Sequence, residues 1–354
     1  MWSTGANSLL MFTLPAELMA AAPPERRGVR RDGVKLLVLD RETHSTKHLL
    51  FRQLADELRP GDLLVLNNSR TLPAVLVGFA DSPHREIEMR LAEQLPDGTW
   101  LALLLCHAAD LFDCGLGSGI AIRFGQDLTA RVLEPDGKIP RLWRVEFSKT
   151  GPELIDTLYR IGSPVRYEYV SGRWKLDDYQ TVYASEPGSA EMPSAGRAFT
   201  WELLLNLRRR GIKVVPLTLH TTLSSLMDDD LDRAHYPKEE AFSIPPETAK
   251  SINETRAAQG RVIAVGTTAV RALESAADSN GSLSPQQGYT RLHIDQSHKL
   301  KIVDGLLTGL HEPHASHLDL LSAFVLPTVI QAAYEEALRR GYLWHEFGDV
   351  NLIL

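Results

Sequence analysis

Residues 260–275 change their hydrophobic period in the middle, from that of a buried strand to that of a helix. Val262 to Val265 is an uninterrupted apolar run, typical of a buried strand, whereas Val270 and Leu273 recur at helical spacing. Gly266-Thr267-Thr268 forms a polar turn between them. A loop that ends a buried strand and opens a helix points N–H groups and hydroxyls at one spot, which suits a carboxylate, a phosphate or a ribose hydroxyl. The alternative is an ordinary connection whose threonines only cap the helix.

Short apolar strands and helices alternate near both ends of the chain. Residues 35–40 and 62–67 predict strands. Further along, the patterns predict helices at 201–210, 246–259 and 329–339, and strands at 213–219 and 300–303. This alternation predicts a mixed sheet covered by helices, and hence an α/β fold.

Residues 72–158 have a different sequence pattern. Apolar residues alternate with charged ones, as in the IEMRL motif at 87–91, and Pro-Asp-Gly turn signals occur at 96–98 and 135–137. This pattern predicts a small all-β domain. Strands and helices alternate on both sides of this segment. We therefore expect the β domain to be inserted into a discontinuous α/β main domain formed by residues 1–71 and 159–354.

Length and charge limit the classes of function. A chain of 354 residues, 44% of them hydrophobic, buries a large core and has a size at which two domains are expected. Its formal net charge of -7 argues against broad nonspecific binding of nucleic acid, although a local basic face could still bind a structured RNA. Basic residues gather at 26–35 and at 208–210, and the second group also fits the basic end that a helix prefers.

Cysteine content and the N-terminal segment bear on the compartment. Cys106 and Cys114 form neither a CxxC motif nor the dense pattern of a disulfide scaffold, so a reducing compartment is expected. The N-terminal apolar stretch is short, contains Pro15 and Glu17, and follows no cationic region. It therefore predicts neither a signal peptide nor a membrane span, and we expect a cytoplasmic protein.

Several histidines are candidates for chemistry. His220 follows the strand at 213–219, at the carboxyl edge of the sheet, where an imidazole acts as a base or acid or simply packs with its nitrogens satisfied. His235 and Glu240 are spaced so that the carboxylate could orient the imidazole, or both are solvated. A metal is not expected at His311, His314 and His317, because on a helix the third would rotate off the face of the first.

Two other features suggest a ligand pocket. Residues 179–200 combine hydroxyl side chains with turn signals just before a helix, so they predict a second polar loop. Arg271 lies near the positive end of its helix, where the dipole disfavours a cation, so we expect it to hold an anionic ligand group or, as the alternative, a protein carboxylate. Residues 266–268, residues 194–196 and His220 are expected to converge in one pocket.

Motifs in the same order along nearly the whole chain resemble those of the S-adenosylmethionine:tRNA ribosyltransferase-isomerase family of queuosine biosynthesis. They are LLVLDR at 36–41, GDLLVLNNSRTLPA at 61–74, YQTVYA at 179–184, PSAG and FT within 193–200, LH at 219–220, RVIAVGTTAVRALES at 261–275, KIVDGLLT at 301–308, His311 with Pro313, LLSAF at 320–324 and FGD at 347–349. The resemblance implies a discontinuous, barrel-like α/β main domain with an inserted small all-β barrel domain, which agrees with the texture of the chain.

The resemblance also implies a reaction. The ribosyl group of S-adenosylmethionine moves to the aminomethyl nitrogen of a 7-aminomethyl-7-deazaguanine base in the anticodon region of a tRNA. Adenine and methionine leave, and the ribose rearranges to an epoxycyclopentane, which gives epoxyqueuosine-tRNA. This chemistry requires a base near the acidified carbon beside the sulfonium and groups that assist adenine departure. S-adenosylmethionine is a substrate, no cofactor or metal is needed, and a monomer is expected.

Matching positions supply the candidate site residues. The candidate catalytic residues are His220, His235, Glu240 and His311. The candidate substrate-binding residues are Asn67, Arg70, Tyr179, Thr181, Tyr183, Ser194, Ala195, Gly196, Gly266, Thr267, Thr268, Arg271 and Asp349.

The chain departs from the family's motifs at several of the matching loops. The family's Pro-Thr-Ala-Gly-Leu-His-Phe-Thr appears as PSAGRAFT at 193–200, which puts Ala198 where the family has an imidazole. Thr222 and Ser224 stand where it usually has glycines, Lys238 replaces the second histidine of a His-x-x-His-x-Glu loop, and Gly-Leu replaces Asn-Phe at 309–310. Two other functions therefore stay open: a paralogous S-adenosylmethionine-using transferase or lyase with a different acceptor, and a noncatalytic RNA- or nucleoside-binding relative.

Overall fold

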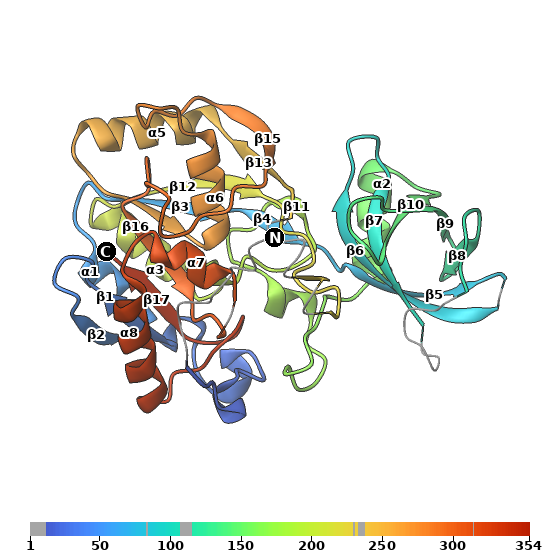
Figure 1. Cartoon of the computed structure of the whole chain (residues 1–354), viewed down its shortest axis with the longest axis horizontal. Coiled ribbons are helices and arrows are strands. Elements are labelled where there is room, and N and C mark those ends of the chain that lie inside the picture. The colour runs from blue at the N-terminus through green and yellow to red at the C-terminus, as the bar shows by residue number, and fades with distance from the viewer. Residues whose placement is uncertain (1–11, 83, 107–114, 229–230, 233–237, 314) are drawn as a thin grey trace, which may run out of the picture.

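The computed structural model describes residues 12–82, 84–106, 115–228, 231–232, 238–313 and 315–354. A large body built on a nine-stranded mixed sheet lies beside a smaller body built on a closed β-barrel (Figure 1). Both sequence-based expectations of the fold, the α/β main part and the β-barrel, are confirmed.

The strands of the main sheet lie in the order β15-β13-β12-β3-β14-β16-β17-β1-β2. Their bounds are β1 Lys35–Leu39, β2 Thr46–Leu50, β3 Leu63–Asn67, β12 Lys213–Leu219, β13 Glu240–Ile244, β14 Val262–Val265, β15 Gln286–Thr290, β16 Gly305–Gly309 and β17 Val350–Ile353. Strands β12, β3, β14 and β16 run parallel in the middle of the sheet, and β17 is antiparallel to β16. The main sheet is open, with β15 and β2 at its edges, so the main domain does not have the barrel-like form that the resemblance implied.

Helices cover the main sheet on both faces, which explains why its central strands read as continuous apolar runs. On one face pack α5 (Pro246–Ala257), α6 (Thr267–Ala276), α7 (His317–Ser322) and α8 (Pro327–Arg339). On the other face pack α1 (Leu54–Glu57) and α3 (Trp201–Arg209). In the part of the chain that the structure describes, no helix has both the length and the apolar character that a membrane span needs.

Six antiparallel strands close the barrel in the order β10-β7-β6-β5-β8-β9. They are β5 Val75–Ala80, β6 Arg85–Gln94, β7 Trp100–Leu105, β8 Ala121–Phe124, β9 Leu128–Pro135 and β10 Leu142–Phe147. The alternating apolar side chains fill the barrel core, and α2 (Gly151–Ile161) packs on it through Leu154 and Leu158. These strands contribute none of the pairings of the main sheet.

A segment of the main body also packs into the barrel core. Leu223 and Leu226 are buried in the same hydrophobic cluster as the barrel strands, and Arg141 donates to the carbonyl oxygens of Leu226 and Met227, both at 3.0 Å. The two bodies therefore share packing beyond the chain crossings. The domain boundaries at 71/72 and 158/159 stay a prediction.

The strand expected at residues 300–303 is wrong, because the sheet strand β16 begins at Gly305. Ile302 and Val303 are buried, which accounts for their apolar pattern, but their N–H groups donate to the carboxylate of Glu274 at 3.0 and 3.1 Å. A carboxylate from α6 thus replaces the neighbouring strand as their hydrogen-bond partner.

Candidate functional site

The carboxyl ends of the parallel strands meet at one edge of the main sheet. Asn67 at the end of β3 pairs in register with Leu217 of β12, and Val265 at the end of β14 pairs with Leu307 of β16. Strand β17 runs the opposite way, so the residue before it, Asp349, lies at the same edge. Ligands of open α/β sheets bind at this edge.

The predicted ligand loops converge there. The Nδ2 group of Asn67 donates to the carbonyl oxygen of Leu219 at 2.9 Å and to Thr268 Oγ1 at 3.2 Å, so it joins the end of β12 to the start of α6. Gly266 has a φ of 94°, which favours glycine, and a Cβ added there would lie 3.6 Å from the Cβ of Ala195. Residues 266–268, residues 194–196 and the end of β12 are therefore neighbours. Their binding of a ligand stays a prediction.

The second polar loop encloses a tyrosine. Gly196 sits directly against the hydroxyl of Tyr183, and a side chain at this position would overlap that oxygen. Thr181 is buried beside it. Tyr179 is 2% exposed, packs edge-to-face on Phe347, and its hydroxyl has no hydrogen-bond partner among the described residues. Hydroxyl groups thus gather behind the turn at 194–196.

His220 is held by two serines. Its Nδ1 lies 2.7 Å from Ser69 Oγ, and that oxygen lies 2.6 Å from Ser189 Oγ. Gly188 packs against the imidazole, and burial lowers the pKa of His220. The fixed Nδ1 leaves Nε2 as the nitrogen that can meet a ligand. A neutral imidazole held in this way is suited to accept a proton.

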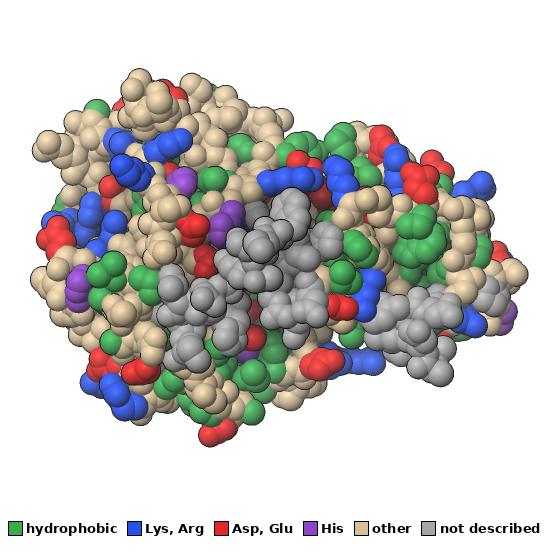
Figure 2. All heavy atoms as spheres, in the orientation of Figure 1, with side chains coloured by type: hydrophobic (Ala, Val, Ile, Leu, Met, Phe, Trp, Pro, Cys, Tyr) green, Lys and Arg blue, Asp and Glu red, His purple; other side chains and the backbone are tan. Residues whose placement is uncertain are grey.

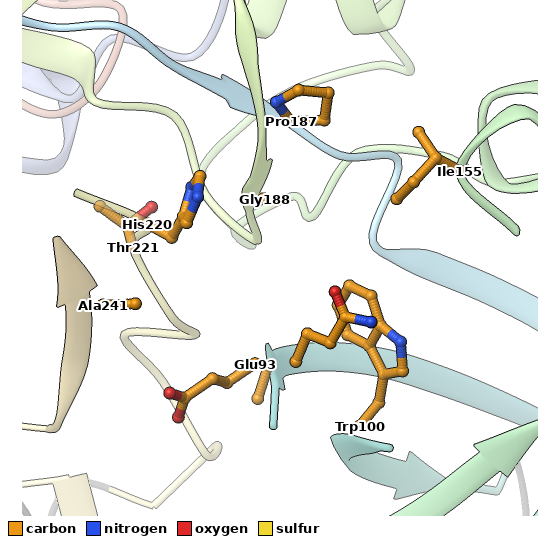
Figure 3. Close-up of a pocket in the computed structure, with 10 residues that line it drawn as sticks. Glu93, Trp100, Ile155, Pro187, Gly188, His220, Thr221 and Ala241 are labelled. Atoms are coloured by element: carbon orange, nitrogen blue, oxygen red, sulfur yellow. The ribbon is translucent and has the colours of Figure 1, made fainter. Parts of the chain in front are cut away.

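A cavity of about 140 Å³ lies beside His220, where the barrel meets the main body (Figure 3). Glu93 and Trp100 line it from the barrel, whereas His220, Thr221 and Ala241 line it from the main sheet. The barrel therefore contributes side chains to the space in front of a candidate catalytic histidine. The sequence pattern did not indicate this contribution.

Glu93 is a candidate residue that the sequence analysis missed. Its strand slips in register between Leu91 and Glu93, and bulges of this kind redirect side chains next to functional sites. Burial and the neighbouring carboxylates of Glu239 and Glu240 raise the pKa of Glu93 to about 7. In the sequence it reads as an ordinary charged residue on the polar face of a strand.

Arg271 pairs with a protein carboxylate, as the alternative interpretation expected. Its guanidinium forms a short ion pair with Glu240 and donates to the carbonyl oxygen of Leu292 at 3.1 Å. Arg271 is 6% exposed and Glu240 is 8% exposed. Burial raises the pKa of Glu240, although the cation of Arg271 opposes this shift. Glu240 therefore orients Arg271, while its predicted partner His235 lies outside the described residues.

His311 stacks on His317, with ring centroids 4.7 Å apart, and its Nε2 lies 2.8 Å from Thr308 Oγ1. Burial lowers the pKa of both imidazoles, that of His317 to about 4. Both rings are therefore neutral near pH 7. Among the described residues, no group of three or more His, Cys, Asp or Glu side chains is placed to hold a metal ion, and His314 lies outside them.

Two predicted substrate-binding residues, Asp349 and Arg70, differ in whether their charged groups are already bonded within the protein. Both oxygens of Asp349 accept main-chain N–H groups, from Lys35 at 2.6 Å and from Leu343 at 2.7 Å, so its carboxylate closes the loop before β17. Arg70 is exposed and its guanidinium lies 5.2 Å from the ring centroid of Tyr159 in α2. Arg70 remains accessible to an anion.

Ser224 lies among polar residues, and the sequence analysis did not single out two of them, Tyr167 and Glu191. Its N–H donates to Glu191 Oε1 at 2.7 Å, and its hydroxyl forms a short hydrogen bond with Tyr167. Lys238 Nζ donates to the carbonyl oxygen of Leu223 at 2.5 Å. Burial raises the pKa of Glu191 and lowers the pKa of Lys238. Ser224 and Lys238, two positions that depart from the family motifs, are thus in one network.

Glu346 is a second carboxyl that sequence reasoning missed. It lines a small cavity together with Ser194 and Ala198, and its Oε1 is buried without a hydrogen-bond partner among the described residues. Burial, together with the neighbouring charge of Glu191, raises the pKa of Glu346 to about 8. The adjoining FGD motif could have drawn attention to this position, but no local pattern marks a buried carboxyl.

The basic residues near the N-terminus are engaged within the molecule. Arg27 donates to the carbonyl oxygen of Phe347 at 2.7 Å, Arg30 pairs with Asp32 at 3.0 Å, and Arg31 pairs with Glu25 at 2.9 Å. On the face shown in Figure 2, lysine and arginine side chains are interspersed with acidic ones. The N-terminal cluster therefore supports the fold as well as adding positive charge.

Comparison with known proteins shows which family the chain resembles. A family model described as queuosine biosynthesis protein matches residues 7–353. The S-adenosylmethionine:tRNA ribosyltransferase-isomerase of Trichlorobacter lovleyi is 39% identical over 348 residues, which cover 97% of this chain and 98% of that protein. The protein of the same name from Gloeobacter violaceus is 38% identical over 347 residues, with 97% and 94% covered.

A solved structure agrees with the sequence matches. The crystal structure of S-adenosylmethionine tRNA ribosyltransferase from Thermotoga maritima is 30% identical and matches with a TM-score of 0.55, over 98% of this chain and 100% of that chain. The family model and the relatives all span nearly the full length of the sequence. The chain therefore belongs to the queuosine biosynthesis protein family.

Proposed function

We propose that the protein transfers and isomerises the ribosyl group of S-adenosylmethionine onto a 7-aminomethyl-7-deazaguanine base in tRNA, with release of adenine and methionine. The observation that carries this proposal is the convergence of three loops at the carboxyl edge of the sheet. The loop at 266–268 lies against Ala195 and is joined through Asn67 to the end of β12, next to His220. Full-length relatives named for this activity support the same function.

The roles of the residues follow from their surroundings. The main-chain N–H groups and threonine hydroxyls at 267–268, at the start of α6, would bind polar groups of S-adenosylmethionine. His220, neutral and fixed through Nδ1 by Ser69, would remove the proton from the carbon beside the sulfonium. Arg70, exposed between the two bodies, would contact a tRNA phosphate.

The cavity beside His220 would receive the acceptor base. It is bounded by the barrel and the main sheet, and the Glu93 carboxyl can hydrogen-bond the N–H edge of a deazaguanine. A base seated there would place its aminomethyl group near the edge where the ribosyl donor binds. This arrangement gives the barrel a direct part in acceptor recognition.

Adenine release tests the proposal. Purified protein is incubated with S-adenosylmethionine alone, with unmodified tRNA, and with tRNA that carries 7-aminomethyl-7-deazaguanine, and free adenine is followed over time. We expect adenine only with the modified tRNA. His220→Ala should lower the rate by about 10²- to 10⁴-fold, the range expected for a lost general base. Equal adenine release in all three incubations would contradict the proposed acceptor.

A second candidate function is the same ribosyl-transfer chemistry on a different acceptor. The observation that favours it is the clustering of departures from the family motifs, since Ser224 and Lys238 both join the network of Glu191 and Tyr167. A changed network on one side of a pocket alters which acceptor fits. Adenine release with another nucleoside or RNA, and none with the modified tRNA, would support this second candidate.

A further inference from the structure

Glu346 lies beside a small cavity near the turn at 194–196. It lines a cavity of about 10 Å³ with Ser194 and Ala198, and a cavity of about this volume holds one water molecule. The methyl side chain of Ala198 leaves this space open. The carboxyl is therefore next to the turn at 194–196, whose other side lies against Gly266.

Among the described residues, no cation forms an ion pair with the carboxyl of Glu346. Arg31 and Arg197 line the same cavity, but Arg31 pairs with Glu25, and Arg197 donates to the carbonyl oxygen of Asp178 and to Glu25 Oε2, both at 2.9 Å. Glu346 also lies within electrostatic range of Tyr179, whose buried hydroxyl has no partner among the described residues. Two buried polar groups without a partner among the described residues are available to hydrogen-bond a water molecule or a bound ligand.

The proposed reaction needs a proton donor that the histidines do not supply. Adenine leaves with the electron pair of its glycosidic bond and must gain a proton, whereas methionine leaves as a neutral thioether and needs none. Burial lowers the pKa of His220, His311 and His317, so these imidazoles are neutral near pH 7 and suited to accept protons. The raised pKa of Glu346, about 8, keeps this carboxyl protonated at the same pH.

We propose that Glu346 donates a proton to the departing adenine, an inference that rests on the proposed function. The glycosidic C–N bond breaks, its electron pair goes to adenine, and the Glu346 proton goes to a ring nitrogen of adenine. Glu346 is left as a carboxylate. The acceptor nitrogen releases a proton when its new bond to carbon forms, and this proton restores the acid. The proton that His220 takes from the carbon beside the sulfonium passes to solvent, and the electron pair of that C–H bond stays in the rearranging ribose, so charge and atoms balance over the cycle.

The test compares Glu346→Gln and Glu346→Asp with a matched control, Glu335→Gln, which removes an exposed carboxyl on α8. Single-turnover adenine release is measured with the modified tRNA, S-adenosylmethionine affinity is measured by calorimetry, and thermal unfolding checks the fold of each variant. We expect Glu346→Gln to lose about 10²- to 10⁴-fold in rate with unchanged affinity, and Glu346→Asp to recover part of the rate.

The pH profile separates proton donation from a structural role. Because the acid must be protonated, the wild-type rate should fall as pH rises through about 8, and the residual rate of Glu346→Gln should not show this fall. An active wild-type protein together with a Glu346→Gln rate within about threefold of it would overturn this inference alone. A wild-type protein that releases no adenine would overturn the proposed function and this inference with it.

Discussion

At the scale of single residues, the site is organised by buried charges whose partners come from distant segments. Arg271 and Glu240 show this most directly, because they are separated by 31 positions and form a buried ion pair. Removing one member of such a pair leaves the other charge buried and unpaired. Removing either member of the pair should therefore destabilise the fold.

We expect Arg271→Ala to lower the free energy of unfolding by about 3–5 kcal/mol, the range for breaking a buried ion pair. Arg291→Ala is the control, because its ion pair with Glu239 is 55% and 41% exposed and should contribute under about 1 kcal/mol. Urea unfolding measures both. Equal small losses in the two variants would show that Arg271 is available to a ligand instead of supporting the fold.

The raised pKa of Glu346 also predicts how the free energy of unfolding depends on pH. Its pKa is about 8 in the folded protein against an ordinary value of 4.5, so the folded state binds more protons between these values. The stabilisation is complete below about pH 4.5 and is lost as pH rises through about 8. The unfolding free energy of Glu346→Gln relative to wild type should therefore increase between about pH 5 and about pH 8.5. Parallel curves for the two proteins would contradict the raised pKa.

At the scale of elements, the loops before the helices can pack closely because they contain glycine. Gly196 allows the turn at 194–196 to lie directly on the hydroxyl of Tyr183. We expect Gly196→Ala to displace the turn, to lower the unfolding free energy by about 1–3 kcal/mol and to weaken binding of S-adenosylmethionine. Gly137→Ala, where an added Cβ meets nothing within 4 Å, is the control and should change stability by under about 0.5 kcal/mol. Unchanged affinity in Gly196→Ala would remove the turn from the site.

Elements with a clear period could be predicted from the sequence, and elements fixed by distant partners could not. Strands β12 and β14 have the predicted bounds, Lys213–Leu219 and Val262–Val265; β14 is buried along its whole length, and β12 is buried at its carboxyl end. Residues 300–303 have the same apolar pattern, yet the carboxylate of Glu274 takes their N–H groups. Glu93 and Glu346 escaped prediction for a related reason, since only the tertiary fold buries them.

At the scale of the whole molecule, the barrel and the main sheet are joined by packing through residues 223–226. Leu226 is 0% exposed within the barrel cluster although it belongs to the main body. We expect Leu226→Ala to lower the unfolding free energy by about 2–5 kcal/mol and to speed hydrogen exchange in β6 and β7. Leu205→Ala, at a site that is 52% exposed, should have little effect. Faster exchange confined to β14 and β16 would contradict a role in barrel attachment.

In the proposed reaction, ribosyl carbon from S-adenosylmethionine reaches the tRNA base. S-adenosylmethionine labelled with ¹³C in its ribose is incubated with the protein and tRNA bearing 7-aminomethyl-7-deazaguanine, and the tRNA nucleosides are analysed by mass spectrometry. We expect one labelled nucleoside with the mass of epoxyqueuosine and an equal amount of free adenine. Adenine release without label in the tRNA would contradict this expectation.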